Sequence, residues 1–302
     1  MELSLWPSTN QSWADLLEGV RHAEATGWHS VYVADHFMGD GAAFGAATSP
    51  WLEATAVLAA LAGATERIRL TPLVLSATYR HPAVLANWAA TVDHASGGRL
   101  TLGLGAGWQV NEHEQYGLEL GSPGQRVRRL EEYLQVVRSL LTEDVTTFVG
   151  GWYSLTDARC EPKPVQRPLP ILVGAKGERM MGVVARQADA WNRWSTPAQM
   201  QVAAELLARA CDQIGRDPAS IHRSTQAAVK LTDDRAEAEA FLAGMAGRAA
   251  VAGPASAFAE MVAGWRDAGV DEVIVPDWHL GVGAQRADAL DALRTAVAPL
   301  LG

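Results

Sequence analysis

Asp35 and His36 follow directly after a short apolar run at 31–34 that has the composition of a buried strand. A carboxylate beside an imidazole suits general acid–base chemistry or the positioning of a cofactor, because histidine titrates near neutral pH. A helix-capping aspartate next to a histidine satisfied by its neighbours would give the same sequence. The pair is the first catalytic candidate, with His36 handling a substrate proton and Asp35 orienting it.

A second candidate segment contains three alternating glycines, Gly103, Gly105 and Gly107, followed by Trp108. Glycine lets the backbone approach a bound ligand closely, although tight packing between strands favours glycine as well. The segment follows an expected strand, as Asp35 and His36 do, so both are candidates for one ligand site.

A third candidate segment is the small-residue loop at 174–179, which opens a helix. The first N–H groups of a helix and its dipole favour an anion at that end. Lys176 and Arg179 add positive charge beside it. The loop is expected to hold a phosphate group.

These candidates need elements that bring them together, and short apolar runs alternate with segments of helical period throughout the chain. Such alternation predicts parallel strands joined by right-handed crossovers. Eight strand–helix units predict an α/β fold, a single (β/α)8 TIM barrel that spans 1–302 as one domain. A doubly wound open sheet is the alternative, but no GxGxxG turn follows the first strand. Strands are expected at 3–6, 31–34, 68–75, 100–104, 171–173, 190–194, 224–231 and 273–275.

An insertion is expected between the fourth and fifth strand–helix units. Residues 145–155 have two β-like runs around Gly150 and Gly151, which predicts a hairpin. Residues 161–170 contain four prolines and predict an extended connector. In a barrel, catalytic residues sit at the carboxyl ends of the strands, where the three candidate segments fall.

The composition excludes several classes of function. The 302 residues are 48% hydrophobic, which is typical of a globular chain, and the formal net charge of −9 argues against a nucleic-acid partner. Only two cysteines occur, Cys160 and Cys211, so neither disulfides nor a cysteine zinc site are expected. No His-x-His follows the first strand, and no metal site is predicted. The chain shows no secretory signal and no apolar run long enough for a bilayer, so a cytoplasmic location without membrane association is expected.

A series of sequence segments resembles the luciferase-like monooxygenase superfamily, most closely its coenzyme F420-dependent oxidoreductases. The resemblance runs from residue 3 to about residue 194 and recurs at 270–280. Each segment alone is loose, and their order and spacing together carry the resemblance. The segments are 23–28, 33–37, 50–54, 64–70, 79–82, 96–100, 103–108, 171–178 and 188–192.

The resemblance implies hydride transfer between the C5 atom of a deazaflavin and an organic substrate, with His36 near the reactive ring carbon. It also implies a cis peptide bond between Leu73 and Val74 that supports the ring. The cofactor contacts that it implies are Asp35, Leu73, Val74, Ser76, Ala106, Gly107, Asn111, Ala175, Lys176, Gly177, Arg179 and Met180.

The chain departs from the sugar-phosphate dehydrogenases of this family at three places. Trp108 is at the position where those enzymes have a glutamate. The segment at 194–198 has no cation that could hold a sugar phosphate. The segment at 8–11 lacks the further glutamate of those enzymes. Oxidation of glucose 6-phosphate is therefore not expected. Trp6, Trp108 and Trp194 are instead expected to contact a small apolar or aromatic substrate.

Other functions remain open at this point. One alternative is an FMN-dependent monooxygenase of the same superfamily, supplied with reduced flavin by a partner reductase. A non-catalytic flavin-binding protein is an alternative of another class. A Schiff-base lyase that uses Lys230, near the end of the seventh strand, is a further one. The exposed helices of the barrel suggest a homodimer.

Overall fold

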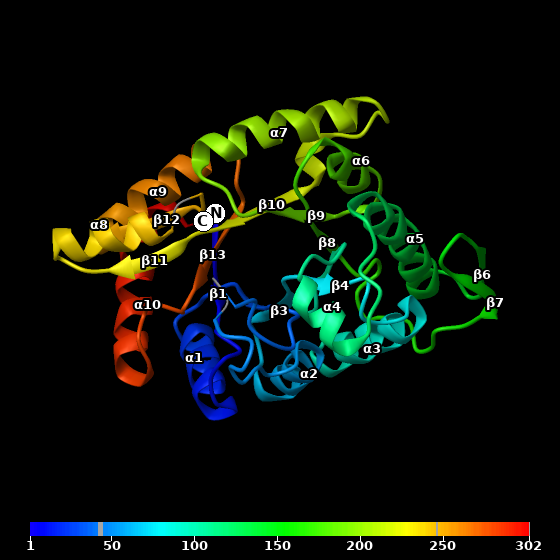
Figure 1. Cartoon of the computed structure of the whole chain (residues 1–302), viewed down its shortest axis with the longest axis horizontal. Coiled ribbons are helices and arrows are strands. Elements are labelled where there is room, and N and C mark those ends of the chain that lie inside the picture. The colour runs from blue at the N-terminus through cyan, green and yellow to red at the C-terminus, as the bar shows by residue number, and fades with distance from the viewer. Residues whose placement is uncertain (42–44, 246, 302) are drawn as a thin grey trace. The chain divides into compact units, whose positions relative to one another are not determined.

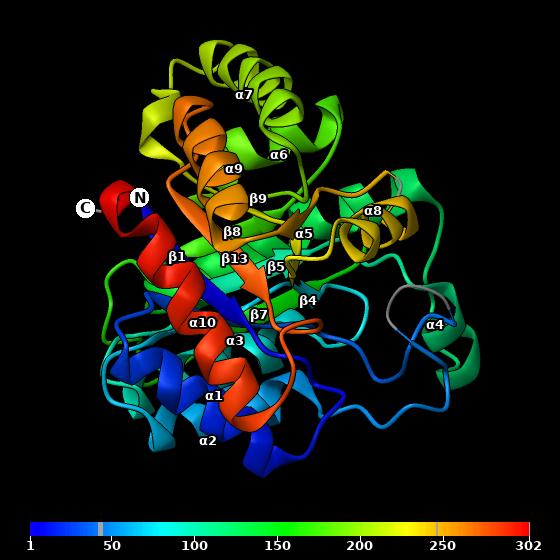
Figure 2. The same ribbon diagram turned by 90° about the vertical axis from the view of Figure 1, so that its left-hand side faces the viewer.

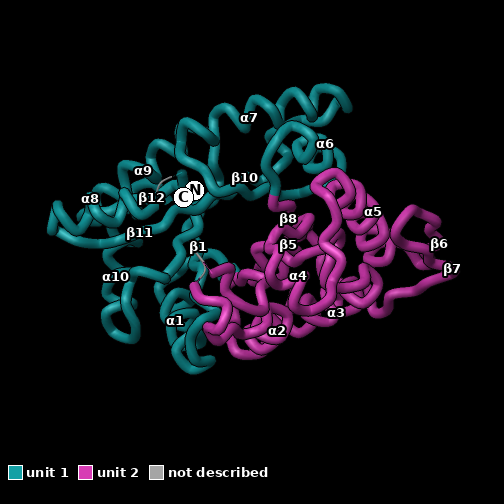
Figure 3. The backbone as a smooth tube through the Cα atoms, viewed as in Figure 1, with its two compact units in different colours: residues 1–32, 175–302 teal, residues 33–174 magenta. Residues whose placement is uncertain are grey.

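The structure is a computed structural model that describes residues 1–41, 45–245 and 247–301 (Figure 1). The chain forms two compact units: unit 1 comprises residues 1–32 and 175–302, and unit 2 comprises residues 33–174 (Figure 3). That the whole chain is a single domain remains a prediction. No helix in the described ranges is long and apolar enough to cross a membrane.

Unit 1 is built on parallel strands in the order β2-β1-β13-β10-β9. The register places Glu2 opposite Glu272 and Trp6 opposite Pro276. A second parallel pair joins β11 to β12. The bounds are β1 Glu2–Trp6, β2 Ser30–Val33, β9 Ala190–Asn192, β10 His222–Gln226, β11 Ala228–Leu231, β12 Ala250–Gly253 and β13 Glu272–Pro276.

Helices α1, α6, α7, α9 and α10 of unit 1 each bury apolar residues, whereas α8 buries none of its side chains and contacts β12. Helices α1 and α10 run side by side, as Figure 2 shows, and α9 contacts α10 and α7. Ser12 caps α1 by accepting a hydrogen bond from the Asp15 N–H at 3.1 Å, and this satisfies one of the N–H groups left open at a helix start. The bounds are α1 Trp13–Ala25, α6 Glu178–Gln187, α7 Pro197–Asp212, α8 Arg235–Gly244, α9 Ala255–Asp267 and α10 Gly283–Val297, with short 3-10 helices at Pro218–Ser220 and Ala298–Leu300.

Unit 2 has a parallel core in which β5 lies between β4 and β8. The antiparallel pair β6 and β7 forms the hairpin expected around Gly150 and Gly151. The peptide bonds before Pro162 and Pro168, in the connector that follows, are cis. The bounds are β3 Arg69–Pro72, β4 Leu75–Ser76, β5 Leu102–Gly105, β6 Thr146–Val149, β7 Ser154–Ala158, β8 Ile171–Gly174, α2 Ala54–Ala64, α3 Pro82–Ala95, α4 Val110–Tyr116 and α5 Pro123–Thr142.

Three elements differ from the sequence-based expectation. The strand expected at 68–75 is divided into β3 and β4, and the cis peptide bond between Leu73 and Val74 lies at the break. The strand expected at 224–231 is likewise divided into β10 and β11, and β11 pairs with the unexpected β12. Helix α4 was not expected, because its sequence VNEHEQY has no apolar period.

Candidate active site

His36 lies just beyond the end of β2 and faces a carboxylate from α4. Its Nδ1 atom is 3.0 Å from Oε2 of Glu112, a residue with no solvent exposure. Glu112 also accepts hydrogen bonds from the Tyr79 hydroxyl at 2.5 Å and from the backbone N–H groups of Phe37 and Met38. The carboxylate therefore anchors the segment 36–38 as well as the imidazole.

The charge state of Glu112 determines which nitrogen of His36 carries a proton. Burial alone would raise the pKa of Glu112, but hydrogen bonds from His36 and Tyr79 outweigh it and lower that pKa. An ionised carboxylate can only accept hydrogen bonds, so the Nδ1 atom of His36 is the donor. In the neutral imidazole, Nε2 is then the acceptor nitrogen.

Asp35 has a different partner from the one expected. Its two oxygens accept hydrogen bonds from the Arg80 guanidinium at 2.8 and 2.9 Å, and Oδ2 also accepts the Ser76 N–H at 2.8 Å. Arg80 contacts Glu53 at 2.5 Å as well. Asp35 thus ties β4 to the end of β2, and the expectation that Asp35 orients His36 is corrected. Glu112 makes that contact, because the guanidinium occupies both oxygens of Asp35.

Several cofactor contacts implied by the resemblance lie close together around β4 and β5. The bond between Leu73 and Val74 is cis, as expected. A Cβ atom on Gly105 would meet Val74 at 2.5 Å, and one on Gly107 would meet the Ser76 hydroxyl at 2.6 Å. Only glycine fits at these two positions, so the backbone at 105–107, including Ala106, lies directly against the segment of the cis bond.

Polar atoms without partners lie near His36. The ring of Trp51 is 5.9 Å from that of His36, and its Nε1 atom is buried without a hydrogen-bond partner in the described part of the chain. Oε1 of Gln109 is orphaned in the same way, while its amide nitrogen donates to the Met38 carbonyl at 3.0 Å. Buried polar atoms normally have partners, so these two indicate a place for polar atoms of a ligand.

Trp108 and Asn111 lie next to His36 and the loop that follows β2. The ring centroid of Trp108 is 5.4 Å from that of His36, and its side chain is 51% exposed. This arrangement suits the substrate contact expected of Trp108. The amide of Asn111 donates to the Gly39 carbonyl at 2.9 Å, so it holds the loop after β2.

The other predicted cofactor residues belong to unit 1, at the start of α6. Gly177 has a φ of +81° and precedes the first turn of this helix, and Met180 is buried. Burial and the nearby charges of Arg193 and Arg248 lower the pKa of Lys176. Nε of Arg193 is buried without a hydrogen-bond partner in the described part of the chain.

This collection of cations at a helix start fits a phosphate group. An anion there would accept hydrogen bonds from the helix N–H groups and relieve the repulsion between the cations. Arg193 and Arg248 were not expected from the sequence, because neither is adjacent to the loop at 174–179. Burial also lowers the pKa of Arg193, as it does for a cation that lacks a counter-charge.

Trp6 and Trp194, the other expected substrate contacts, also belong to unit 1 and pack against each other with Trp278. The ring centroids are 4.9 Å apart for Trp6 and Trp278, 6.0 Å for Trp194 and Trp278, and 6.1 Å for Trp6 and Trp194. Trp6 is buried, so the half-buried rings of Trp194 and Trp278 form the accessible side of the cluster. Trp278 was not expected.

Lys230, the candidate for Schiff-base chemistry, forms an ion pair. Its Nζ atom lies 3.0 Å from Oε1 of Glu237. A lysine nucleophile must be an uncharged amine, and a neighbouring carboxylate favours the ammonium form, so this contact does not support the lyase alternative.

Comparison with known proteins identifies the family of the chain. The luciferase-like monooxygenase family model matches residues 1–297. The chain belongs to the luciferase-like monooxygenase family. The resemblance inferred from the sequence is thereby confirmed.

Two relatives of this luciferase-like chain have different activities. The F420-dependent glucose-6-phosphate dehydrogenase of Amycolatopsis mediterranei is 37% identical over 176 residues, which cover 58% of this chain and 51% of that protein. The pyrimidine monooxygenase RutA of Escherichia coli strain SMS-3-5 is 33% identical over 186 residues, which cover 59% and 51%. The chain spans about half the length of the curated relatives it matches.

A solved structure confirms the fold of the luciferase-like chain. An F420-dependent secondary alcohol dehydrogenase in complex with an F420–acetone adduct superimposes with a TM-score of 0.87 at 20% identity, covering 98% of each chain. The chain therefore has an α/β fold of the parallel-strand TIM-barrel type. Whether the hairpin and proline-rich connector are an insertion into that fold stays a prediction.

Proposed function

We propose that this luciferase-like protein is an F420-dependent oxidoreductase that acts on a small apolar or aromatic molecule. The observation that carries the proposal is the imidazole of His36, oriented by a buried and ionised Glu112 and surrounded by two tryptophan rings and two orphaned polar atoms. A deazaflavin, when bound, supplies hydride exchange at its C5 atom. The protein then has to bind and orient both partners and move one proton.

His36 is the group that moves this proton. Because Nδ1 donates to Glu112, Nε2 accepts a proton from a substrate hydroxyl during oxidation and returns one during reduction. The imidazolium that forms is stabilised by the Glu112 carboxylate. General acid–base assistance of this type contributes roughly 10²–10⁴-fold to a rate.

Within unit 1, Lys176, Arg193 and the N–H groups at the start of α6 would hold the cofactor phosphate. Trp108, next to His36, would bind the apolar part of the substrate, and Trp194 and Trp278 are further aromatic candidates. A small-molecule substrate, a homodimer and a cytoplasmic location are part of the proposal.

A second candidate is supported by the similarity to the monooxygenase RutA. In this candidate FMN is the cofactor, and a partner reductase delivers it in reduced form. The cations at the start of α6 would suit a flavin phosphate equally well. We favour F420 because the 0.87 superposition and the 37% identical relative both belong to F420-dependent enzymes.

Substrate turnover tests the proposal. The protein, loaded with oxidised F420, is exposed to a panel of secondary alcohols, and the loss of cofactor absorbance is followed; reduced F420 is tested with imines and activated alkenes. The proposal expects turnover of an apolar or aromatic compound and none of glucose 6-phosphate. Oxygen-dependent product formation with reduced FMN, and no F420 turnover, would establish the second candidate instead.

A further inference from the structure

Four strands of unit 1 begin with residues that can bind a metal ion. Glu2 opens β1, His222 opens β10, Glu272 opens β13, and His29 immediately precedes β2. The strands are parallel neighbours in the order β2-β1-β13-β10, so their amino ends meet at one edge of the sheet. The aromatic residue Trp6 lies at the opposite end of β1.

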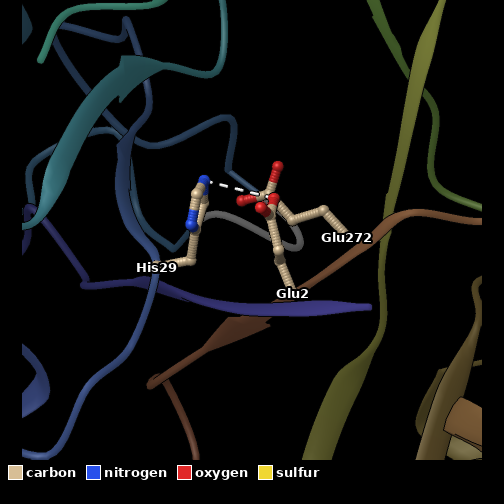
Figure 4. Close-up of side chains that lie close together, drawn as sticks. All are labelled: Glu2, His29 and Glu272. Atoms are coloured by element: carbon tan, nitrogen blue, oxygen red, sulfur yellow. Dashed lines mark ion pairs between the residues drawn. The ribbon is translucent and has the colours of Figure 1, made fainter. Parts of the chain in front are cut away.

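The side chains point toward one another. The ligand atoms of Glu2, His29 and Glu272 all lie within 4.8 Å of one another (Figure 4). Nε2 of His29 is 3.1 Å from Oε2 of Glu2, and Nε2 of His222 is 3.8 Å from the same oxygen. Nε2 of His222 is also 3.1 Å from Oε2 of Glu272.

Three of these separations are close to those between the ligands of a tetrahedral metal ion. With metal–ligand distances of about 2.0–2.1 Å, two ligand atoms of a tetrahedral Zn²⁺ site lie roughly 3.3 Å apart. The three contacts of 3.1, 3.1 and 3.8 Å bracket that value. A histidine nitrogen contacts a carboxylate oxygen at this distance through a proton, and a metal ion bound here would replace that proton.

The surroundings of the cluster are those of a metal centre. Glu272 is buried, and its oxygens accept hydrogen bonds from the Tyr32 hydroxyl at 2.7 Å and from the Ser4 hydroxyl. Nδ1 of His222 faces the Asp271 carboxylate at 4.0 Å. Partners of this kind orient metal ligands and fix the tautomer of a metal-binding histidine. Three carboxylates around two imidazoles also leave an excess of negative charge.

We propose that Glu2, His29 and Glu272 form a site for one divalent transition-metal ion, with Zn²⁺ as the best match and with His222, which lies outside that mutually close set but contacts both carboxylates, as the fourth ligand. Two imidazole nitrogens favour Zn²⁺ over Mg²⁺ or Ca²⁺, which prefer oxygen ligands. The ion links the starts of four strands that are distant in the sequence. It is therefore a structural ion that stabilises the folded state.

Metal binding can be measured without any cofactor. The whole protein is treated with a chelator and desalted, and Zn²⁺ is titrated against a chromophoric chelator. The expected result is one bound Zn²⁺ per chain, undisturbed by millimolar Mg²⁺, and a melting temperature about 5 °C higher with excess Zn²⁺. His29→Gln and His222→Gln should each weaken binding at least about tenfold.

His22 provides the matched control. Its Nε2 atom lies 2.8 Å from Oδ1 of Asp291 as an isolated pair, so His22→Gln removes a histidine–carboxylate contact and should leave Zn²⁺ affinity unchanged. If His222→Gln fails to fold, Glu2→Gln at a partly exposed position replaces it, with the same expected loss. Substoichiometric binding by the wild type, displacement by Mg²⁺, or equal affinity in the His29, His222 and His22 variants would overturn the proposal.

Discussion

Nδ1 of His36 lies 3.0 Å from Oε2 of Glu112, although the two residues are 76 positions apart in the chain. His36 follows β2 and Glu112 lies in α4, and the same carboxylate holds Tyr79 and the backbone after His36. The contact fixes both the position and the tautomer of the imidazole. It defines the candidate active site more sharply than the neighbouring pair Asp35 and His36.

The first prediction concerns His36 itself. His36→Ala should retain cofactor binding within about twofold, because the anion-binding residues belong to α6 and its surroundings. Its kcat should fall about 10²–10⁴-fold, because the substrate proton would have to move without the imidazole. Stopped-flow and binding measurements on the same preparation would show both effects. His94→Ala, which removes an exposed histidine bonded to the Lys163 carbonyl, is the control; unchanged turnover in His36→Ala would contradict the assigned role.

The second prediction concerns the pH dependence of stability at Glu112. Its pKa is lowered in the folded state, so the ionised form stabilises the fold at pH values above its unfolded pKa of about 4.3. That contribution is lost as pH falls through the lowered folded-state pKa. Glu112→Gln should therefore cost about 1–3 kcal/mol of unfolding free energy at pH 6–8, and the cost should shrink below about pH 4. Urea unfolding at several pH values would show this, and a cost that is constant with pH would contradict it.

The third prediction uses two glycines with similar backbone angles. Gly107 has φ +80° and Gly117 has φ +65°, so alanine at either position is strained by about 1–2 kcal/mol. At Gly107 the new Cβ would also meet the Ser76 hydroxyl at 2.6 Å and the Thr78 hydroxyl at 2.9 Å, whereas nothing lies within 4 Å at Gly117.

Gly107→Ala should accordingly lose about 1–3 kcal/mol more stability than Gly117→Ala. It should also weaken cofactor binding, because the backbone at this position is one of the implied contacts. Urea unfolding and a binding titration on both variants measure the two effects. Equal losses of stability in both variants would show that the backbone at Gly107 does not lie in close contact with the Ser76 and Thr78 hydroxyls.

The sequence predicts the elements that carry the site better than the contacts within it. Strand ends next to Asp35, Gly107 and Ala175 follow from composition and alternation, and so does the start of a helix after the loop at 174–179. The position of the cis bond is predicted by the resemblance alone, and the bond lies at the break in the strand expected at 68–75.

The sequence does not identify Glu112 as a site residue, for a physical reason. Helix α4 has only seven residues and no apolar face, and Glu112 and His113 are buried because they hydrogen-bond partners outside the helix. Burial of charged residues through tertiary partners leaves no periodic signal in the sequence. The sequence between Trp108 and Tyr116 has six polar residues and one valine, and this composition is the only local indication of such a segment.

The corrected role of Asp35 has a similar origin. Its partner Arg80 lies 45 positions along the chain, whereas His36 is its neighbour in sequence, and adjacency suggested the wrong pair. Successive residues of an extended segment point in opposite directions, so Asp35 and His36 face different partners. The orientation of a side chain at a strand end depends on packing that spacing alone does not specify.

The most direct test of the proposed function is an anaerobic titration of the cofactor-free protein with F420 and, in parallel, with FMN, followed by cofactor fluorescence. We predict tight F420 binding, at least about tenfold weaker FMN binding, and a loss of F420 affinity in Arg193→Gln. The reverse preference would contradict F420 dependence and direct attention to a reduced-flavin monooxygenase. Binding of neither cofactor would contradict the site itself.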